Sequence, residues 1–260
     1  LTDLPLPLTG YSARIPSDVP TLPRQLRDIG YNTMAVGKWH LTPRNEQSPA
    51  GPFTRWPLGM GFERYYGFLG GGTNQWVPDL VSDNGFVEPP MTPDEGYHLT
   101  EDLAARAIRL VQDRQQADPG KPFFLYFAPG AVHSPHQVPP SWIEPYRGRY
   151  DRGWEAIRRE ICATQKELGV IPPETTLTGR PPWIADWESL SNDERRLFAR
   201  MMEVYAGFVT HTDAQVGHLV EYFADTGLLE NTLFLILSDN GASAEGGPHG
   251  MLSQEATELG

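Results

Sequence analysis

The chain of 260 residues has a single cysteine, Cys162, which excludes an intramolecular disulfide and a cysteine-rich metal site. It also lacks long hydrophobic runs. The longest, residues 123–128 and 233–237, are far shorter than the roughly 20 residues that a helix needs to cross a bilayer. The first residues contain no basic segment followed by a continuous apolar one, so they do not form a signal peptide.

Positive charge is scarce too. The sequence has 21 Lys and Arg against 33 Asp and Glu, a formal net charge of −12. This balance excludes a general nucleic-acid or anionic-membrane binder, which would need a basic face. Glycine and proline are frequent, at 26 and 25 residues, but an aromatic content of 11% is unlike that of a disordered chain. We therefore expect a folded, loop-rich protein.

The first part of the chain predicts one helix and one short strand. A helix is expected over residues 21–30, with Thr21 as its cap, Gly30 at its end, and Leu22, Leu26 and Ile29 on its buried face. A short strand follows over residues 33–36. Residues 42–98 are dense in proline, glycine and aromatic residues and are predicted to form long irregular loops.

The rest of the chain predicts two more helix–strand pairs. A helix from about Thr100 has an apolar stripe, and a strand over residues 122–128 is apolar enough to be buried on both faces. A capping box, Ser191 to Glu194, opens a helix that is expected to reach Asp225, before a buried strand over residues 232–237. This order predicts an α/β fold with parallel neighbouring strands and covering helices. The apolar stripe of the helix that begins near Thr100 consists of Leu103, Ala107, Leu110 and Val111.

Polar side chains follow each of the three predicted strands. In open α/β sheets, ligands bind beyond the carboxyl ends of the strands, so these groups are expected to converge on one active site. They are Lys38 and His40 after the first strand, His133 and His136 after the second, and Asp239 and Asn240 after the third.

The chemistry of these groups suits an anionic substrate. Lys38 and His40 point to the same side of an extended chain, where Lys38 can hold an anionic oxygen and His40 can move a proton. Asp239 and Asn240 offer hard oxygen ligands for Ca²⁺ or Mg²⁺, and further ligands would have to come from elsewhere. His133 is placed to donate a proton to a leaving group.

Each group also has a plainer interpretation. Asp239 and Asn240 precede a glycine, and Asn-Gly is a strong turn dipeptide. Lys38 is an amphipathic side chain beside Trp39 and can simply extend to solvent. The pair His133 and His136 is also consistent with an incidental loop cluster or a transition-metal site, although no third ligand lies at a local zinc spacing.

Three motifs together resemble the sulfatase family, most closely the bacterial arylsulfatases. Residues 30–41, GYNTMAVGKWHL, resemble the second sulfatase signature, G-Y-x-T-x-x-x-G-K-W-H-L. Residues 133–135 are similar to the H-x-P that follows a buried strand in the family, and residues 238–241 resemble its metal-binding S-D-N-G. Their order and spacing agree over nearly the whole chain.

The resemblance implies an alkaline-phosphatase-like fold, a mostly parallel sheet flanked by helices, and hydrolysis of small-molecule or carbohydrate sulfate esters. In this sequence Lys38 would contact the sulfate and the nucleophile, and His40 would bind the nucleophile and help break the covalent intermediate. His133, or His136 if the loop register differs, would protonate the departing alcohol. Asp239 and Asn240 would be ligands of one divalent cation, Ca²⁺ more than Mg²⁺.

Some parts of the family pattern do not occur here. Sulfatases use a formylglycine made within C/S-x-P-x-R, and Cys162 has neither that Pro nor that Arg and comes after the Lys38 motif. The paired acidic ligands and a second active-site lysine are also missing. We therefore expect residues 1–260 to be the central part of a catalytic domain truncated at both ends, inactive alone. The alternatives are a phosphatase or phosphodiesterase of the same superfamily and a non-catalytic binding protein on this scaffold; the oligomeric state is not predicted.

Overall fold

The computed structural model of the protein describes residues 14–16, 18–238, 247 and 250. These residues fall into two compact units. The first contains the described residues up to Gln137 together with Thr212–Leu233, and the second contains Val138–His211 with the described residues from Phe234 onward. Each unit is described by itself. No helix among the described residues is long and apolar enough to span a bilayer.

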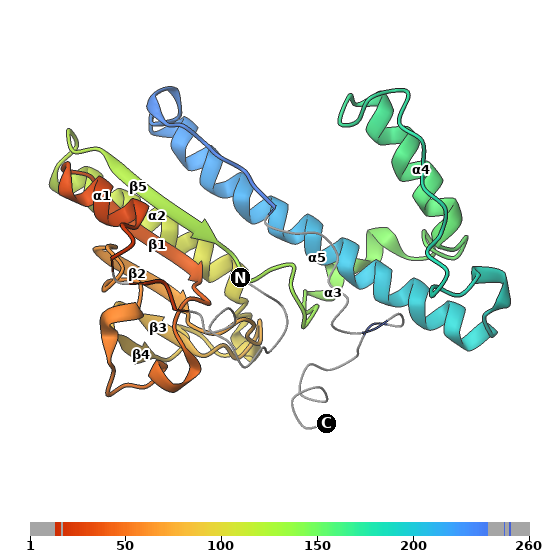
Figure 1. Cartoon of the computed structure of the whole chain (residues 1–260), viewed down its shortest axis with the longest axis horizontal. Helices are drawn as coiled ribbons and strands as arrows, with labels where there is room; N and C mark the ends of the chain where they lie inside the picture. The colour runs from red at the N-terminus through yellow and green to blue at the C-terminus, as the bar shows by residue number, and fades with distance from the viewer. Residues whose placement is uncertain (1–13, 17, 239–246, 248–249, 251–260) are drawn as a thin grey trace. The chain divides into compact units, whose positions relative to one another are not determined.

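The first unit is built on a five-stranded sheet with the order β4-β3-β2-β1-β5 (Figure 1). Strand β1 pairs in parallel with both β2 and β5, whereas β2 with β3 and β3 with β4 are antiparallel. The predicted α/β fold is confirmed, but the sheet is mixed and is parallel only around β1. The strands are β1 (Asn32–Lys38), β2 (Arg64–Phe68), β3 (Leu80–Ser82), β4 (Gly85–Val87) and β5 (Phe123–Ala128).

Helix α2 (Leu99–Ala117) covers one face of this sheet, and all four residues of its predicted apolar stripe are buried. The hydroxyl of Tyr66 on β2 donates to Asp102 on α2 over 2.6 Å. Burial and the neighbouring carboxylate of Asp102 raise the pKa of Tyr66 well above its usual value. The last turns of α5 (Asn192–Asp225) cover β5 on the same face, where Phe223 packs against Phe123 with ring centroids 5.8 Å apart.

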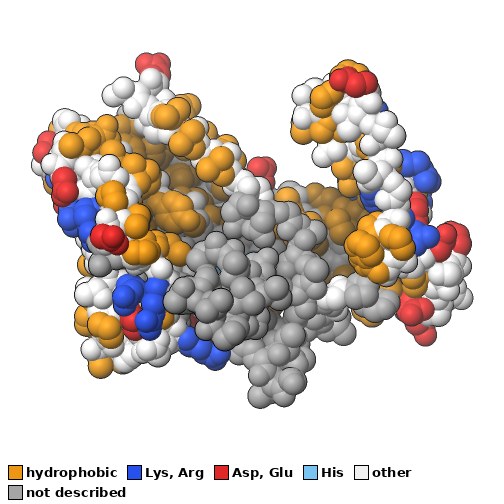
Figure 2. Space-filling model, in the orientation of Figure 1, with side chains coloured by type: hydrophobic (Ala, Val, Ile, Leu, Met, Phe, Trp, Pro, Cys, Tyr) orange, Lys and Arg blue, Asp and Glu red, His pale blue; other side chains and the backbone are white. Residues whose placement is uncertain are grey.

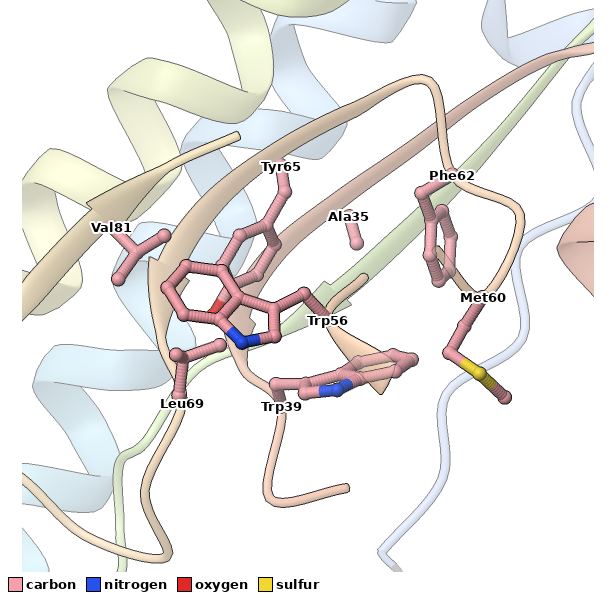
Figure 3. Packing of buried hydrophobic residues seen from close by; sticks show 8 residues of the cluster. All are labelled: Ala35, Trp39, Trp56, Met60, Phe62, Tyr65, Leu69 and Val81. Carbon is pink, nitrogen blue, oxygen red and sulfur yellow. The ribbon is translucent and has the colours of Figure 1, made fainter. Parts of the chain in front are cut away.

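An aromatic cluster covers the opposite face (Figure 3). It is formed by side chains of β1 and β2 together with residues of the 41–62 segment, which contains the short helices η2 (Arg44–Glu46) and η3 (Phe53–Arg55). Trp56 is fully buried and donates its indole N–H to the carbonyl of Glu46. Full burial of one such side chain contributes about 1.5–3 kcal/mol, so this segment is anchored without long regular elements.

Helix α1 (Leu22–Asp28) lies within the predicted range, and Gly30 follows its C-cap with a φ of +100°. Its predicted buried face is wrong, because Leu22 and Ile29 are 56% and 73% exposed and the helix buries Pro23 instead. Polar contacts set this rotation: the Arg24 guanidinium donates to the carbonyl of Gly59 over 3.1 Å. Hydrophobic side chains consequently gather on the surface over α1 and β5 (Figure 2).

The prediction of irregular loops throughout residues 42–98 is also wrong, because β2, β3 and β4 lie there along with η4 (Pro93–Glu95). These strands are only three to five residues long. Pairing with β1 organises β2, and a tight turn at Asp83 joins β3 to β4. Such short strands depend on their partners and have little periodicity of their own.

Two predicted buried strands are less buried than their composition suggests. β5 forms the edge of the described sheet, and Tyr126 is 45% exposed. Residues 232–238, which follow η7 (Leu229–Asn231), have no regular structure, and Leu235 and Leu237 are 74% and 86% exposed. A strand is stabilised by hydrogen bonds to a neighbouring strand, and the described part of the chain supplies no such neighbour to residues 232–238.

The second unit is helical. Its elements are α3 (Pro140–Ile143), η5 (Glu144–Tyr146), α4 (Trp154–Glu167), η6 (Trp187–Ser189) and the first turns of α5. The predicted capping box is confirmed, because the Ser191 N–H donates to Glu194 over 2.8 Å and the Glu194 N–H donates to the Ser191 hydroxyl over 3.3 Å. The predicted end of α5 at Asp225 is confirmed too. Helix α4, which was not predicted, packs Trp154 edge-on against Trp187.

The backbones of β1, β2 and β5 approach closely at the carboxyl end of β1. Gly37 has a φ of +110°, and a Cβ atom there would lie 2.0 Å from the carbonyl oxygen of Ala128. A Cβ atom at Gly67 would lie equally close to the carbonyl oxygen of Gly37. Only glycine fits these positions, because a side chain would push the three strands apart.

Replacement of Gly37 with Ala is therefore expected to destabilise the protein strongly. Positive φ alone costs an alanine about 1–2 kcal/mol, and the clash with Ala128 adds roughly 1–3 kcal/mol. Gly30→Ala is the matched control, because Gly30 has a φ of +100° but nothing within 4 Å of its Cβ position. Urea unfolding of the full-length protein measures both variants, and an equal loss of stability in the two would disprove the crowding argument.

Candidate active site

Lys38 ends β1 at the edge of the sheet where β2 and β5 also end. In the parallel registers Lys38 lies opposite Phe68 of β2, and Gly37 lies opposite Ala128 of β5. The segments that follow these three strands therefore begin side by side. Lys38 itself is half-buried, which suits a cation that must reach a substrate beyond the strand end.

His40 is held in an unusual backbone conformation just beyond Lys38. Its φ is +50°, a left-handed value that costs a non-glycine residue roughly 1–2 kcal/mol. Two contacts maintain it: the His40 N–H donates to the carbonyl of Leu69 over 3.1 Å, and the Trp39 indole donates to the carbonyl of Arg55 over 2.9 Å. Backbone strain that the surrounding structure maintains is common at functional sites.

The segment after β2 lies directly against the His40 ring. A Cβ atom at Gly71 would be 2.8 Å from Cε1 and 2.9 Å from Nε2 of His40. His40 therefore lies between the segments that follow β1 and β2, although its side chain is still exposed. This arrangement aims the imidazole while leaving it accessible to a ligand.

His133 lies in the loop of residues 129–137, which follows β5. Its backbone N–H donates to the carbonyl of Gly130 over 3.0 Å, which closes a turn. Its ring Nδ1 lies 2.7 Å from the carbonyl oxygen of Ser134. Because a carbonyl only accepts, Nδ1 is the donor in this contact.

His136 lies in the same loop. Partial desolvation and, to a lesser extent, the charge of the nearby His133 lower the pKa of His136, while a hydrogen bond to the Val132 carbonyl acts in the opposite direction. The structure therefore places both candidate acids, His133 and His136, in the loop that follows β5.

The structure thus brings Lys38, His40 and the loop of His133 to one edge of the first unit, as the strand order predicted. Asp239 and Asn240 lie outside the described residues. Cys162 is half-buried on α4 in the second unit. The roles of these residues stay predictions, because their arrangement alone does not assign a reaction.

A second Ser-Asp-Asn-Gly, which the sequence reasoning overlooked, occurs at residues 82–85. In the structure it is the turn between β3 and β4, with Asp83 at a φ of +55°. The carboxylate of Asp83 accepts from the N–H of Tyr65 over 2.9 Å. The tetrapeptide is therefore compatible with a plain hairpin turn, and only its place in the order of the sulfatase motifs distinguishes the copy at residues 238–241.

Comparisons with known proteins agree on one family. The family model described as Sulfatase matches residues 1–259. An arylsulfatase of Klebsiella aerogenes is 32% identical over 249 residues, which cover 90% of this chain and 50% of that enzyme. The chain spans about half the length of these curated relatives, 50% of that arylsulfatase and 43% of an uncharacterized sulfatase of Schizosaccharomyces pombe.

Solved structures support the fold. The yidJ protein of Bacteroides fragilis aligns with a TM-score of 0.58 and 20% identity, covering 84% of this chain and 43% of that one. Ps i-CgsB, solved in complex with k-i-k-neocarrahexaose, aligns with a TM-score of 0.50 and 22% identity, covering 82% of this chain and 38% of that one. At these identities the structures show the fold alone.

The helix-flanked mixed sheet with polar groups at its carboxyl edge defines an α/β protein of the alkaline-phosphatase-like class. Within that class, the chain belongs to the sulfatase family.

The contact between Gly71 and His40 predicts a selective effect on activity. Gly71→Ala is expected to turn the His40 ring away and to lower the aryl sulfate hydrolysis proposed below about 10- to 100-fold in the full-length protein, because small misplacements of reacting groups are costly. Gly70→Ala is the matched control, since its Cβ position meets only the carbonyl oxygen of Gly72 at 3.4 Å. Thermal unfolding should be similar in both variants; equal activity in both would contradict the assigned contact.

Proposed function

We propose that the protein containing this chain hydrolyses sulfate esters, and that residues 1–260 supply the central part of its catalytic domain. The observation that carries the proposal is the meeting of Lys38, His40 and the His133 loop at one strand edge in a chain of the sulfatase family. Hydrolysis releases an alcohol and inorganic sulfate. The site must therefore neutralise the sulfate oxygens and supply a proton to the departing oxygen.

The described residues match these two requirements. Lys38 provides positive charge for the sulfate oxygens as the S–O bond breaks. His133, with Nδ1 held by the Ser134 carbonyl, gives a proton from Nε2 to the leaving oxygen. His40, aimed by its neighbours on two segments, orients and exchanges a proton with the attacking hydroxyl group.

Asp239 and Asn240 are proposed to bind one divalent cation. Their carboxylate and amide oxygens are hard donors, which suit Ca²⁺ better than a transition metal, and the flexible coordination of Ca²⁺ favours it over Mg²⁺. Sulfatases are generally metal-dependent. When bound, the cation supplies charge stabilisation to the sulfate, and a formylglycine outside this chain supplies the nucleophile. This chain by itself is expected to be inactive.

Aryl sulfates and sulfated carbohydrates are both proposed as substrates, since the relatives include an arylsulfatase and a structural neighbour solved with an oligosaccharide. A phosphatase or phosphodiesterase of the same superfamily is less well supported, because the relatives found by sequence are sulfatases. A non-catalytic binding protein on the same scaffold is the third reading, and the activity measurements below distinguish it from the first.

Loss of either Lys38 or His133 is expected to abolish most activity. In the full-length protein, Lys38→Ala should lower aryl sulfate hydrolysis about 10²- to 10³-fold by removing charge stabilisation. His133→Ala should lower it about 10²- to 10⁴-fold by removing the acid. Lys121→Ala, at the amino end of β5, and His218→Ala, on α5 and outside the segments that follow the three strands, are matched controls. Near-native rates in either test variant would refute its assigned role.

Asp239→Ala is expected to remove the bound cation. Elemental analysis of the purified full-length protein should find about one Ca²⁺ in the unmodified protein and little in the variant, because a hard cation depends on its carboxylate ligands. Asp83→Ala is the control, since Asp83 stands in the same tetrapeptide but forms a hairpin turn. Equal metal content in the Asp239 variant and the unmodified protein would remove Asp239 from the proposed site.

A further inference from the structure

Three segments of the first unit meet in a buried polar cluster beside the His133 loop. Gln75 follows β2, His98 precedes α2, and Gln137 ends the loop that follows β5. Gln75 and His98 are each only 2% exposed. We call Gln75, His98, Thr100 and Gln137 the loop latch. Nothing in the proposed reaction uses these residues, and their burial requires that their polar atoms be satisfied.

The two ring nitrogens of His98 have different contacts. Its Nε2 lies 3.0 Å from the carbonyl oxygen of Gln137, which can only accept, and its Nδ1 lies 3.3 Å from the N–H of Thr100, which can only donate. In this arrangement His98 donates from Nε2 to Gln137 and caps α2 with Nδ1. The Trp76 ring packs edge-on against it at 4.8 Å, which restricts its rotation.

Gln75 also binds Gln137, through the Gln137 side chain. Its backbone N–H donates to the side-chain oxygen of Gln137 over 2.8 Å, and its backbone carbonyl accepts from the N–H of Leu99 over 2.8 Å. Its own side-chain oxygen accepts from the Thr100 hydroxyl over 3.1 Å. Gln137 is thus held by both its carbonyl and its side chain, within a network whose bonds strengthen one another.

The other end of the His133 loop is also fixed. A Cβ atom at Gly130 would lie 2.7 Å from Cζ of Phe68, so the loop begins in close contact with the end of β2. His133 lies between this contact and Gln137, and its N–H is bound to the Gly130 carbonyl. A loop fixed at both ends has few conformations, and the direction of the His133 ring depends on those ends.

We propose that the loop latch positions His133 as the acid, with His98 as the positioning residue that closes the latch on Gln137. The inference rests on the proposed function, because it assigns the latch a task in proton donation. His98 touches no substrate in this account. It acts through the loop, so its removal should affect the proton-transfer step more than the stability of the fold.

Two variants separate the two contacts of His98. In His98→Asn, the short side-chain oxygen can still cap the Thr100 N–H, but no group reaches the Gln137 carbonyl. In His98→Gln, the longer side-chain amide can donate to Gln137 in place of Nε2. Thr33→Val is the control. It removes two bonds of the buried Thr33 hydroxyl near the amino end of β1, one donated to the Gly61 carbonyl and one accepted from the Glu63 N–H.

The first measurement needs no activity. Amide hydrogen exchange of the full-length protein is expected to be about 3- to 10-fold faster in His98→Asn at residues 73–77 and 130–137, since one buried hydrogen bond is lost. Exchange along α2 should be unchanged, because its cap is kept. His98→Gln should restore slow exchange in the two segments. Unchanged exchange there in His98→Asn, or equal acceleration along α2, would overturn the latch.

The second measurement uses two substrates that differ in leaving group. Phenyl sulfate releases a basic phenoxide and needs a proton, whereas 4-nitrophenyl sulfate releases a stable anion. His98→Asn is expected to lower kcat about tenfold more for phenyl sulfate than for 4-nitrophenyl sulfate, with similar KM values. His98→Gln should recover much of the difference, and Thr33→Val should lower both rates equally. An equal decrease in kcat on both substrates in His98→Asn would show that His98 has only a structural role.

The outcomes distinguish the two proposals. An unmodified full-length protein that hydrolyses neither sulfate overturns the proposed function and, with it, the positioning role of His98. The exchange measurement then still decides whether His98 holds the loop. A protein that is active, but whose variants keep the leaving-group ratio of the unmodified protein, overturns the positioning role alone.

Discussion

The close approach of three parallel strands at Gly37 is the constraint on which the rest of the structure depends. With no side chain at Gly37 or Gly67, β2 and β5 can both pair with β1 up to its last residues. Parallel pairing then directs the segments after all three strands to one edge. Lys38, the His40 turn and the His133 loop share that edge because their strands share a register. Backbone packing therefore brings the candidate site residues together, and their side-chain chemistry acts only once they are in place.

The groups at this edge are fixed mainly by backbone atoms. The carbonyl of Leu69 accepts from the N–H of the strained His40, the carbonyl of Ser134 accepts from Nδ1 of His133, and the carbonyl of Gln137 accepts from Nε2 of His98. Each of these carbonyls accepts a hydrogen bond and belongs to a segment that follows β2 or β5. The aromatic cluster on one face and α2 on the other keep those strands in place. The orientation of these histidines therefore depends on the packing that holds β2 and β5 in the sheet.

Sequence patterns predicted the elements with strong periodicity or clear end signals. The stripe and position of α2 and the capping box of α5 were correct, and α1 ends two residues before the predicted Gly30. The rotation of α1 was wrong because polar contacts to the 59–61 turn outweigh the burial of Leu22 and Ile29. Strands β2 to β4 were missed because they are short and are stabilised by pairing with neighbouring strands, which local sequence does not show. Residues 232–237 read as a buried strand on composition alone, and composition does not supply a partner.

For the candidate site, local sequence alone was enough to select Lys38, His40 and His133 as candidates, because each of these polar residues follows a predicted strand. It had no means of finding the loop latch. Gln75, His98 and Gln137 are far apart along the chain, and none has a recognisable local pattern. The sequence by itself determined the order of the strands, the family and the chemical groups at the strand ends. Only the tertiary structure decided which groups orient them, because hydrogen bonds between distant segments exist only once packing has brought those segments together.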